Sequence, residues 1–395
     1  MRPRLVLFGA GNIGRSFIGQ LFARGGYEVV FVDIDERIVA ELNRRGGYDV
    51  VIAHPDGHET TIEVEGVRAV SANDREAVAR EIVDASIAAT AVGTGALPAV
   101  AGLIRSGVER RRRERPESPL DVILAENAHD AAAIVADALG SGPGGEENRR
   151  AVGLVETSIG KMVPIVPSEV AARDPLLVYA EPYNTLIVDA HGFRGTAPDV
   201  PDLRSVENIR AYVERKLFLH NLGHAAVAYL GFRNAPRITL IAEAVELPPV
   251  RSATRAAMSE SVTALAAAHP DTLDHASLEE HREDLLTRFA NRALGDTVFR
   301  VGRDLSRKLG RDDRLVGAMR LAASHGLPFD AMAEVYRAAL GFAATDAAGK
   351  PRPADLAVVE LARARGTGAV LHEVSGLDER DPVDARVIER VLAAG

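Results

Sequence analysis

Three glycines directly behind a short apolar segment constrain the fold of this chain more than any other feature. The segment RLVLF (residues 4–8) is followed by Gly9, Gly11 and Gly14, then by a helical stretch and a second apolar segment that ends at Asp33. In a dinucleotide site such glycines allow a tight turn, close approach of the pyrophosphate and close packing of helix on strand. An acid about 20 residues further on binds the ribose hydroxyls. The pattern therefore predicts a nucleotide-binding βαβ unit, with a plain strand-to-helix turn as the alternative.

The predicted cofactor is NAD, because the carboxylate of Asp33 would repel the 2′-phosphate of NADP. The turn residues expected to bind it are Gly9, Gly11, Asn12, Ile13 and Gly14. The apolar segment 85–93 is expected to be a strand that lines the cofactor through Thr90 and Gly93. The next strand, LDVILAEN (120–127), places Asn127 at its carboxyl end, where ligands of open α/β sheets gather. A local turn or cap made by this side chain is the alternative.

From residue 199 onward, strand signals give way to long stretches of helical periodicity. We therefore expect an α/β N-terminal Rossmann-type domain over residues 1–198 and a mainly α-helical substrate and catalytic domain over residues 199–395. The stretch VENIRAYVERKLFLHNLGHAAVAYLG (206–231) is expected to form one long helix.

Charge and composition disfavour several classes of partner. A net charge of −9 argues against binding to nucleic acid or anionic membranes, and the run RRRRER (110–115) is interpreted as a solvated helix face. The absence of cysteine excludes disulfides and thiolate catalysis. No apolar run approaches the roughly 18 residues of a membrane span. We expect a cytoplasmic, metal-independent protein that binds a small molecule and is a monomer or homodimer.

Lysine is rare in this chain, with four lysines among 47 basic residues. A lysine can lose its proton inside a protein, whereas arginine effectively cannot. In ERKLFLHNLGH (214–224), Lys216, Asn221 and His224 fall within about 140° of arc on an α-helix. One interpretation is structural, with a snorkelling lysine and a satisfied Asn–His pair. The chemical interpretation has Lys216 as general base, Asn221 as donor to a developing alkoxide, and His224 orienting the substrate or the lysine.

The segments FGAGNIGRSFIGQL, TAVG, AEN and above all ERKLFLHNLGHAAVAYLG resemble the polyol-specific long-chain dehydrogenases. The resemblance extends over nearly the whole chain. It implies a Rossmann domain, a mainly helical C-terminal domain and hydride transfer without a metal. It also implies that Lys216 is the general base, that Asn221 and Asn127 are oxyanion donors, and that His224 binds substrate.

Among the departures from the family pattern, two concern expected substrate contacts. Gly160 stands where the family has a substrate-contacting aspartate, and Lys161, a predicted substrate-binding residue, replaces an arginine. Further substrate contacts are expected from the basic residues of the segment FRVGRDLSRKLG, which are Arg300, Arg303, Arg307 and Lys308. Their role would be to bind a phosphate or distal hydroxyls, and a solvated basic helix is the alternative.

The resemblance implies NAD-dependent oxidation of a polyol phosphate to a sugar phosphate and the reverse reaction, with mannitol 1-phosphate and fructose 6-phosphate as the expected pair. The departures at residues 160 and 161 keep a second enzyme hypothesis open, a dehydrogenase of an unphosphorylated polyol, sugar acid or cyclitol. A third hypothesis, from a different class, is a non-catalytic NAD-sensing protein.

Overall fold

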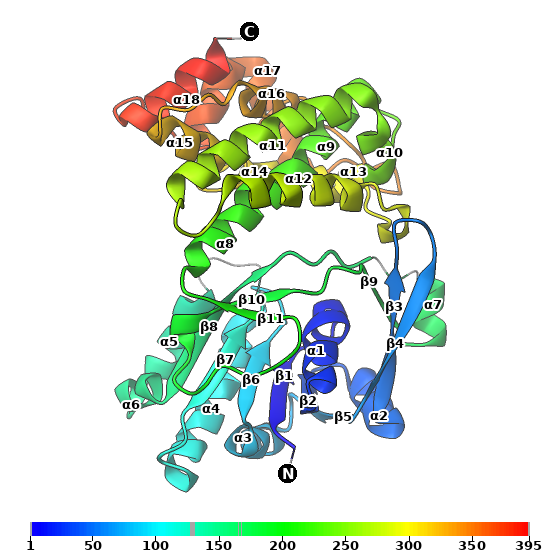
Figure 1. The fold of residues 1–395 in the computed structure, drawn as a ribbon, viewed down its shortest axis with the longest axis vertical. Coiled ribbons are helices and arrows are strands. Elements are labelled where there is room, and N and C mark those ends of the chain that lie inside the picture. The colour runs from blue at the N-terminus through cyan, green and yellow to red at the C-terminus, as the bar shows by residue number, and fades with distance from the viewer. Residues whose placement is uncertain (1, 127–130, 165, 167, 394–395) are drawn as a thin grey trace. The chain divides into compact units, whose positions relative to one another are not determined.

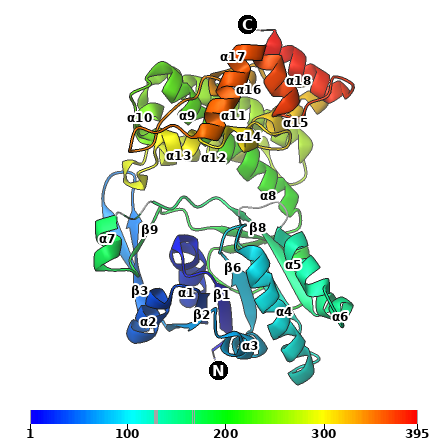
Figure 2. The same ribbon diagram turned by 180° about the vertical axis from the view of Figure 1, so that it is seen from behind.

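The computed structural model describes residues 2–126, 131–164, 166 and 168–393. The chain divides into two compact units, which can be followed in Figures 1 and 2. Unit 1 comprises Met1–His54 and His58–Ile209, and unit 2 comprises Pro55–Gly57 and Arg210–Gly395. The chain passes from one unit to the other after Ile209, later than the boundary at residue 198 expected from the sequence.

Unit 1 is built on an eight-stranded sheet with the order β11-β10-β8-β7-β6-β1-β2-β5. The six strands from β8 to β5 are parallel, whereas β10 runs antiparallel to β8. The parallel strands are β1 (Arg4–Phe8), β2 (Glu28–Asp33), β5 (Val67–Ser71), β6 (Ile87–Thr90), β7 (Leu120–Leu124) and β8 (Val152–Ile159). The added strands are β10 (Leu186–Asp189) and β11 (Leu203–Val206). This is the doubly wound order in which β1 and β6 flank the topological switch point.

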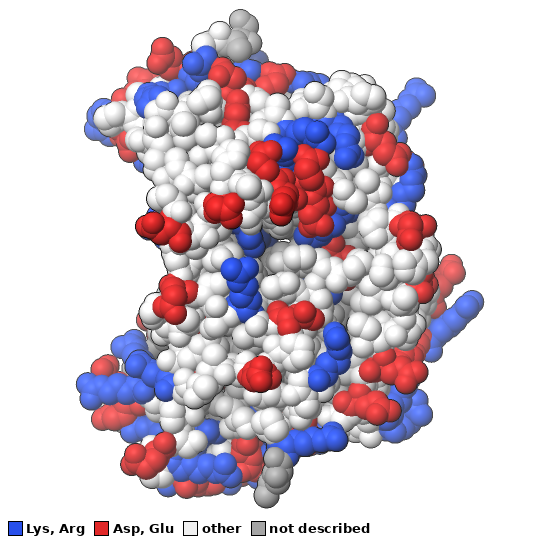
Figure 3. All heavy atoms as spheres, viewed as in Figure 1, with Lys and Arg blue, Asp and Glu red and all other residues white. Residues whose placement is uncertain are grey.

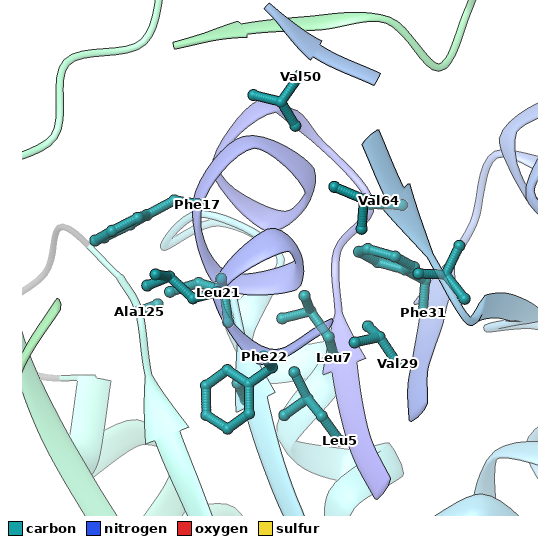
Figure 4. Packing of buried hydrophobic residues seen from close by; sticks show 14 of the residues in the cluster. Leu5, Leu7, Phe17, Leu21, Phe22, Val29, Phe31, Val50, Val64 and Ala125 are labelled. Atoms are coloured by element: carbon teal, nitrogen blue, oxygen red, sulfur yellow. The ribbon is translucent and has the colours of Figure 1, made fainter. Parts of the chain in front are cut away.

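Helices cover both faces of the sheet. One face carries α3 (Arg75–Asp84), α4 (Leu97–Glu114) and α5 (Ala131–Gly140), followed by α6 (Gly145–Arg150). The other face carries η1 (Gly14–Gly19), α1 (Gln20–Arg24) and α2 (Glu36–Arg45). Figure 4 shows Phe22 of this second layer beside Leu5 and Leu7 of β1, with Leu21 toward Ala125, and all five belong to one buried apolar cluster. Because both faces are buried, the central strands are continuous apolar runs, as a parallel sheet requires.

A second, three-stranded sheet in unit 1 has no counterpart in the sequence-based expectation. Its order is β4 (Glu59–Glu65), β3 (Gly47–Ala53) and β9 (Val178–Ala180). The hairpin β3–β4 is local, but β9 joins it in parallel from a distant part of the chain. Unit 1 also contains α7 (Ser168–Arg173) and the short helix η2 (Ala190–Gly192).

Unit 2 is helical around a central helix, α9 (Leu222–Asn234), that is buried on nearly all sides. Small residues allow its neighbours to approach closely: a Cβ on Gly223 would lie 2.6 Å from Sδ of Met258 on α11. The hydroxyl of Tyr229 donates to the carbonyl of Gly302 at 3.1 Å, which satisfies a polar group in the core. The expected mainly helical C-terminal region is confirmed.

The helices of unit 2 precede and follow α9 in chain order. They are α8 (Ile209–Arg215), η3 (Lys216–Asn221), α10 (Ile241–Glu246), α11 (Pro248–Ala268), α12 (His275–Phe289), η4 (Arg292–Leu294), α13 (Val298–Gly302), α14 (Leu305–Lys308), α15 (Val316–Ser324), α16 (Asp330–Ala339), α17 (Pro353–Glu373) and α18 (Pro382–Leu392).

The surface mixes both signs of charge, and Figure 3 shows acidic and basic side chains interspersed on the face it presents. The interpretation of residues 110–115 as a solvated face is wrong for Arg111, which is buried. Its guanidinium donates to the carbonyls of Ile82, Val83 and Ala85 at 2.7–3.0 Å and so caps the end of α3. No helix in the described part of the chain is both long and apolar enough to cross a membrane.

Candidate functional site

The glycine turn behind β1 depends on close backbone packing. Gly9 has a φ of +97°, and a Cβ there would lie 2.5 Å from the carbonyl oxygen of Ala91. A Cβ on Gly14 would lie 1.9 Å from the carbonyl oxygen of Gly9, whereas a Cβ on Gly11 would meet nothing within 4 Å. Gly9 and Gly14 are therefore required by the turn itself, while Gly11 leaves its side of the loop open to an incoming ligand.

Asp33 ends β2 and braces the same turn. Its carboxylate accepts the N–H of Ala10 at 2.6 Å and that of Asp35 at 2.9 Å. The side chain remains partly exposed, and the neighbouring Ile34 is 75% exposed. A half-solvated carboxylate beside an exposed apolar side chain suits a ribose with its attached base. Ile34 was missed from the sequence, although a large apolar residue directly behind the end of a strand was a usable signal.

The turn behind β6 lies beside the glycine turn, because β6 pairs with β1. Thr90 is fully buried, and its hydroxyl has no hydrogen-bond partner among the described residues. Glu126, two residues beyond the end of β7, accepts the N–H groups of Val92 and Gly93 at 2.9 and 2.8 Å and fixes this turn. Glu126 was not predicted as a site residue, and the predicted Asn127 lies outside the described residues.

Lys161 is buried in unit 1. Its ammonium donates to the carbonyl oxygens of Glu181 and Tyr183 at 3.1 and 2.8 Å, and to Oδ1 of Asn184 at 2.8 Å. An ammonium has three N–H donors, and at least three protein acceptors surround this one. The geometry assigns Lys161 to holding the segment 181–184, and the substrate contact expected from the sequence stays a prediction.

The helix that carries Lys216 contains a π turn. The chain runs through α8, η3 and α9, and η3 is a π-helix that begins at Lys216 and ends at Asn221. The three elements form one continuous helix, as expected, but it begins at Ile209 rather than at Val206, which ends β11, and it contains this wider turn. In an α-helix, residues five apart point about 140° away from each other, but a π turn bonds residue i to residue i+5 and places them one above the other. The wider turn thus brings Lys216 and Asn221 onto one face, and such turns are frequent at functional sites.

The surroundings of Lys216 favour its neutral form. Burial and the nearby charge of Arg314 lower the pKa of Lys216 to about 8, against an opposing effect of Asp313. Arg314 is itself buried and donates from Nε to Oδ1 of Asp313 at 2.6 Å. An amine with this pKa is partly deprotonated near neutral pH and can act as a general base.

His224 is held on α9 by two side chains. Its ring stacks on Phe289 with centroids 4.8 Å apart, and its Nε2 lies 3.4 Å from Oδ2 of Asp296. Asp296 is buried and also forms an ion pair with Arg300. One carboxylate therefore orients both a predicted catalytic residue and a predicted substrate-binding residue. The sequence reasoning missed Asp296, although its spacing of four residues from Arg300 was a signal.

The basic segment turns sharply at Asp304. This residue has a φ of +76°, a left-handed conformation that costs energy outside glycine. Asp355 at the start of α17 compensates, since its carboxylate accepts the N–H of Asp304 at 3.0 Å and that of Leu305 at 2.8 Å. Asp304 in turn accepts from Arg352 at 2.6 Å. The turn that separates α13 from α14 is thus fixed from α17.

The basic side chains of the segment 300–308 differ in exposure and in how many protein acceptors they already contact. Lys308 is buried, and its ammonium donates to the carbonyl of Val301. Burial and the charge of Arg314 lower the pKa of Lys308 to about 7. Arg307 is exposed and paired with carboxylates on either side in the chain. Arg303 is exposed and forms no ion pair among the described residues; its guanidinium lies 5.8 Å from the centre of the Phe299 ring.

Two further histidines belong to this region: His220 lies in η3 itself, and His281 lies on α12. Burial lowers the pKa of His281 to about 3 and holds the pKa of His220 well below its ordinary value. Both imidazoles are therefore neutral at neutral pH. Within the described ranges, no group of three or more His, Asp or Glu side chains is arranged to hold a metal ion.

Two family models together match most of the chain. The mannitol dehydrogenase Rossmann domain matches residues 3–202, and the mannitol dehydrogenase C-terminal domain matches residues 208–388. Mannitol-1-phosphate 5-dehydrogenase of Brevibacillus brevis is 34% identical over 389 residues, covering 98% of this chain and 96% of the relative. The protein of the same name from Pseudarthrobacter chlorophenolicus is 35% identical over 388 residues, covering 96% and 95%.

Solved structures share the fold at lower identity. A substrate-free D-sorbitol dehydrogenase has a TM-score of 0.79 at 18% identity, covering 98% of this chain and 92% of that one. Mannitol 2-dehydrogenase of Pseudomonas fluorescens, solved with NAD and D-mannitol, has a TM-score of 0.70 at 16% identity and covers 100% of this chain and 95% of that one. The predicted fold class, a Rossmann-type domain followed by a mainly helical domain, is confirmed.

Proposed function

This chain belongs to the mannitol dehydrogenase family, and from that premise we propose that it interconverts mannitol 1-phosphate and fructose 6-phosphate with NAD. The observation that carries the proposal is the π turn that runs from Lys216 to Asn221, where the pKa of the lysine is lowered to about 8. The choice of substrate is supported by relatives named mannitol-1-phosphate 5-dehydrogenase that match nearly the full chain at 34% and 35% identity.

The residues behind β1, β2 and β6 fit NAD. A ligand can approach the open side of Gly11, Asp33 offers a half-solvated carboxylate to the ribose hydroxyls, and Ile34 offers an apolar surface to the base. The negative charge of Asp33 favours NAD over NADP. When bound, the nicotinamide ring accepts the hydride that leaves the alcohol carbon.

Proton transfer falls to the residues of unit 2. In the direction of oxidation, neutral Lys216 takes the proton of the substrate hydroxyl, and the amide of Asn221 donates to the oxygen as negative charge develops on it. His224, held by Phe289 and Asp296, offers a fixed hydrogen-bonding group to a neighbouring hydroxyl. In the reverse direction the ammonium of Lys216 returns the proton to the new alcohol. Asn127 keeps the second oxyanion role that the family resemblance implies.

We assign the phosphate contact first to Arg303. It is exposed and has no carboxylate partner among the described residues, so it can bind an anion without breaking an ion pair. Arg300 lies near it, since the charge of Arg303 contributes, after burial, to lowering the pKa of Arg300. Arg307 and Lys308, whose donors already have protein acceptors, follow as supporting contacts.

A second candidate is a dehydrogenase of an unphosphorylated polyol, sugar acid or cyclitol. The observation that favours it is the enclosure of Lys161, whose three acceptors lie within the protein, beside a glycine at position 160. Both positions depart from the family pattern, so the substrate's distal end can be bound differently here.

The test is a panel of mannitol 1-phosphate, mannitol, sorbitol and fructose 6-phosphate, followed by nicotinamide absorbance in wild type and Lys216→Arg. We expect turnover with the phosphorylated pair and its loss in Lys216→Arg, because arginine stays protonated. Lys350→Arg, in an exposed loop, is the matched control and should keep full activity. Turnover confined to unphosphorylated polyols would select the second candidate. Absence of turnover with every compound would exclude the proposed reaction and leave a sugar-acid or cyclitol dehydrogenase and a non-catalytic NAD-binding protein.

A further inference from the structure

A basic cavity lies in unit 1 between α4 and the loop that joins α5 to α6. It has a volume of about 540 Å³ and is lined by Arg105, Glu109, Arg112 and Arg113 of α4 together with the loop residues 141–143. The adjacency of α4, α5 and α6 can be followed in Figures 1 and 2. Its volume falls within the range of small-molecule sites.

The cavity carries more positive than negative charge. Arg113 is exposed and has no hydrogen bond or ion pair to any described residue. Arg112 donates to neutral oxygens, the side-chain carbonyl of Asn148 at 2.8 Å and, more weakly, a loop carbonyl at 3.4 Å. Arg105 bonds the hydroxyl of Ser141 and lies 3.5 Å from the carboxylate of Glu109. Three guanidinium groups thus face one lining carboxylate, in a chain whose net charge is −9.

The cavity is separate from the predicted cofactor turn. Helix α4 begins at Leu97, close behind the turn that follows β6, and Arg113 lies sixteen residues further along the same helix. At 1.5 Å per residue this is about 24 Å of helix, and Arg105, the lining residue nearest the turn, lies about 12 Å along it. The far wall is a glycine-rich loop in which Gly142 and Gly144 have φ of +80° and +75°, a backbone that other residues adopt only with strain.

We propose that this cavity binds a phosphate-bearing small molecule. Guanidinium groups bind phosphate oxygens in pairs of parallel charge-assisted hydrogen bonds, and Arg112 and Arg113 can turn toward such an anion without losing a carboxylate partner. The inference concerns binding only. It does not depend on the catalytic assignment of Lys216 or on the identity of the polyol.

The experiment is isothermal titration calorimetry on the full chain, saturated with NAD so that the cofactor turn is occupied. The probes are pyrophosphate, ADP and fructose 6-phosphate, which does not react while the cofactor is oxidised. Arg113→Gln and the double variant Arg105→Gln/Arg113→Gln remove charge from the cavity. Arg150→Gln on nearby α6, whose arginine is exposed and paired with Glu146, is the matched control.

We expect at least one probe to bind wild type and Arg150→Gln equally, and to bind Arg113→Gln about tenfold more weakly, as the loss of one charge-assisted contact implies. Weaker binding of ADP to Arg113→Gln than to wild type would identify a nucleotide site. Weaker binding of fructose 6-phosphate to this variant would identify a sugar-phosphate site. Equal affinity in all variants, or no binding by any probe, would overturn the proposal. Because Arg113 bonds no described residue, its replacement should leave the melting temperature unchanged, which separates lost binding from misfolding.

Discussion

The lowered pKa of Lys216 predicts the pH dependence of the reaction. If neutral Lys216 takes the hydroxyl proton, the rate of polyol oxidation follows the neutral fraction of this amine. With a pKa of about 8, the neutral fraction is about one in eleven at pH 7; at the ordinary value of 10.5 it would be about one in 3,000. The environment of the lysine therefore supplies about 300-fold more base at pH 7.

The expected profile follows from the sign of this shift. Below pH 8, kcat/KM for oxidation should rise about tenfold per pH unit and then level off above about pH 8. The reduction of fructose 6-phosphate needs the ammonium form, so its rate should fall as the pH passes the same value. Both are measured as initial rates of NADH formation or consumption in buffers of constant ionic strength.

Substitution of Arg314 tests the cause of the lowered pKa of Lys216 most directly. The charge of Arg314 is the largest contribution to the lowered pKa after burial, and it also neutralises Asp313. In Arg314→Gln, Lys216 loses a repulsive neighbour and the carboxylate of Asp313 loses its partner, so both changes favour the ammonium. The oxidation profile should move to higher pH by about one unit or less. Lys350→Arg serves as the control and should leave the profile in place.

Two outcomes would refute this reasoning. One is an oxidation rate that does not change between pH 6 and 9 although the chemical step limits turnover, which a substrate deuterated at the reacting carbon can establish. The other is a profile in Arg314→Gln that coincides with that of wild type while the variant keeps its melting temperature. The first result would remove Lys216 as the titrating base, and the second would remove the charge of Arg314 as a cause of its lowered pKa.

Three further expectations concern the cofactor and metals. Gly14→Ala should lower the melting temperature, because its Cβ would meet the carbonyl of Gly9, whereas Gly11→Ala should keep the fold and weaken NADH binding; thermal unfolding and fluorescence titration compare the two. Asp33→Asn should weaken NADH binding about tenfold through loss of charge at the ribose while NADPH binding improves, and an unchanged ratio of the two affinities would contradict the role of Asp33. Dialysis against a chelator should leave activity intact, and a loss that zinc or magnesium restores would show a metal requirement.

The local parts of the fold were predictable from the sequence. A strand, a glycine turn, a helix and a terminal acid occur within 30 residues, and each is specified by its own neighbours. The small sheet was not predictable in this way. Its strands β3 and β9 are more than 120 residues apart in the sequence, and β9 is only three residues long. Arg111 was misjudged for a related reason, since its carbonyl acceptors on α3 are distant in sequence.

The spacing of Lys216 and Asn221 shows how far the sequence alone could go. Five residues separate the two, a spacing that puts their side chains about 140° apart on an α-helix. The residue types Lys and Asn indicated a general base and an oxyanion donor in this helix. The apolar pattern around them, however, is the same for an α-helix with or without one wider turn. The π turn brings the two side chains closer to alignment. The sequence could identify these residues as candidates, and the helix geometry explains why their spacing is five rather than four.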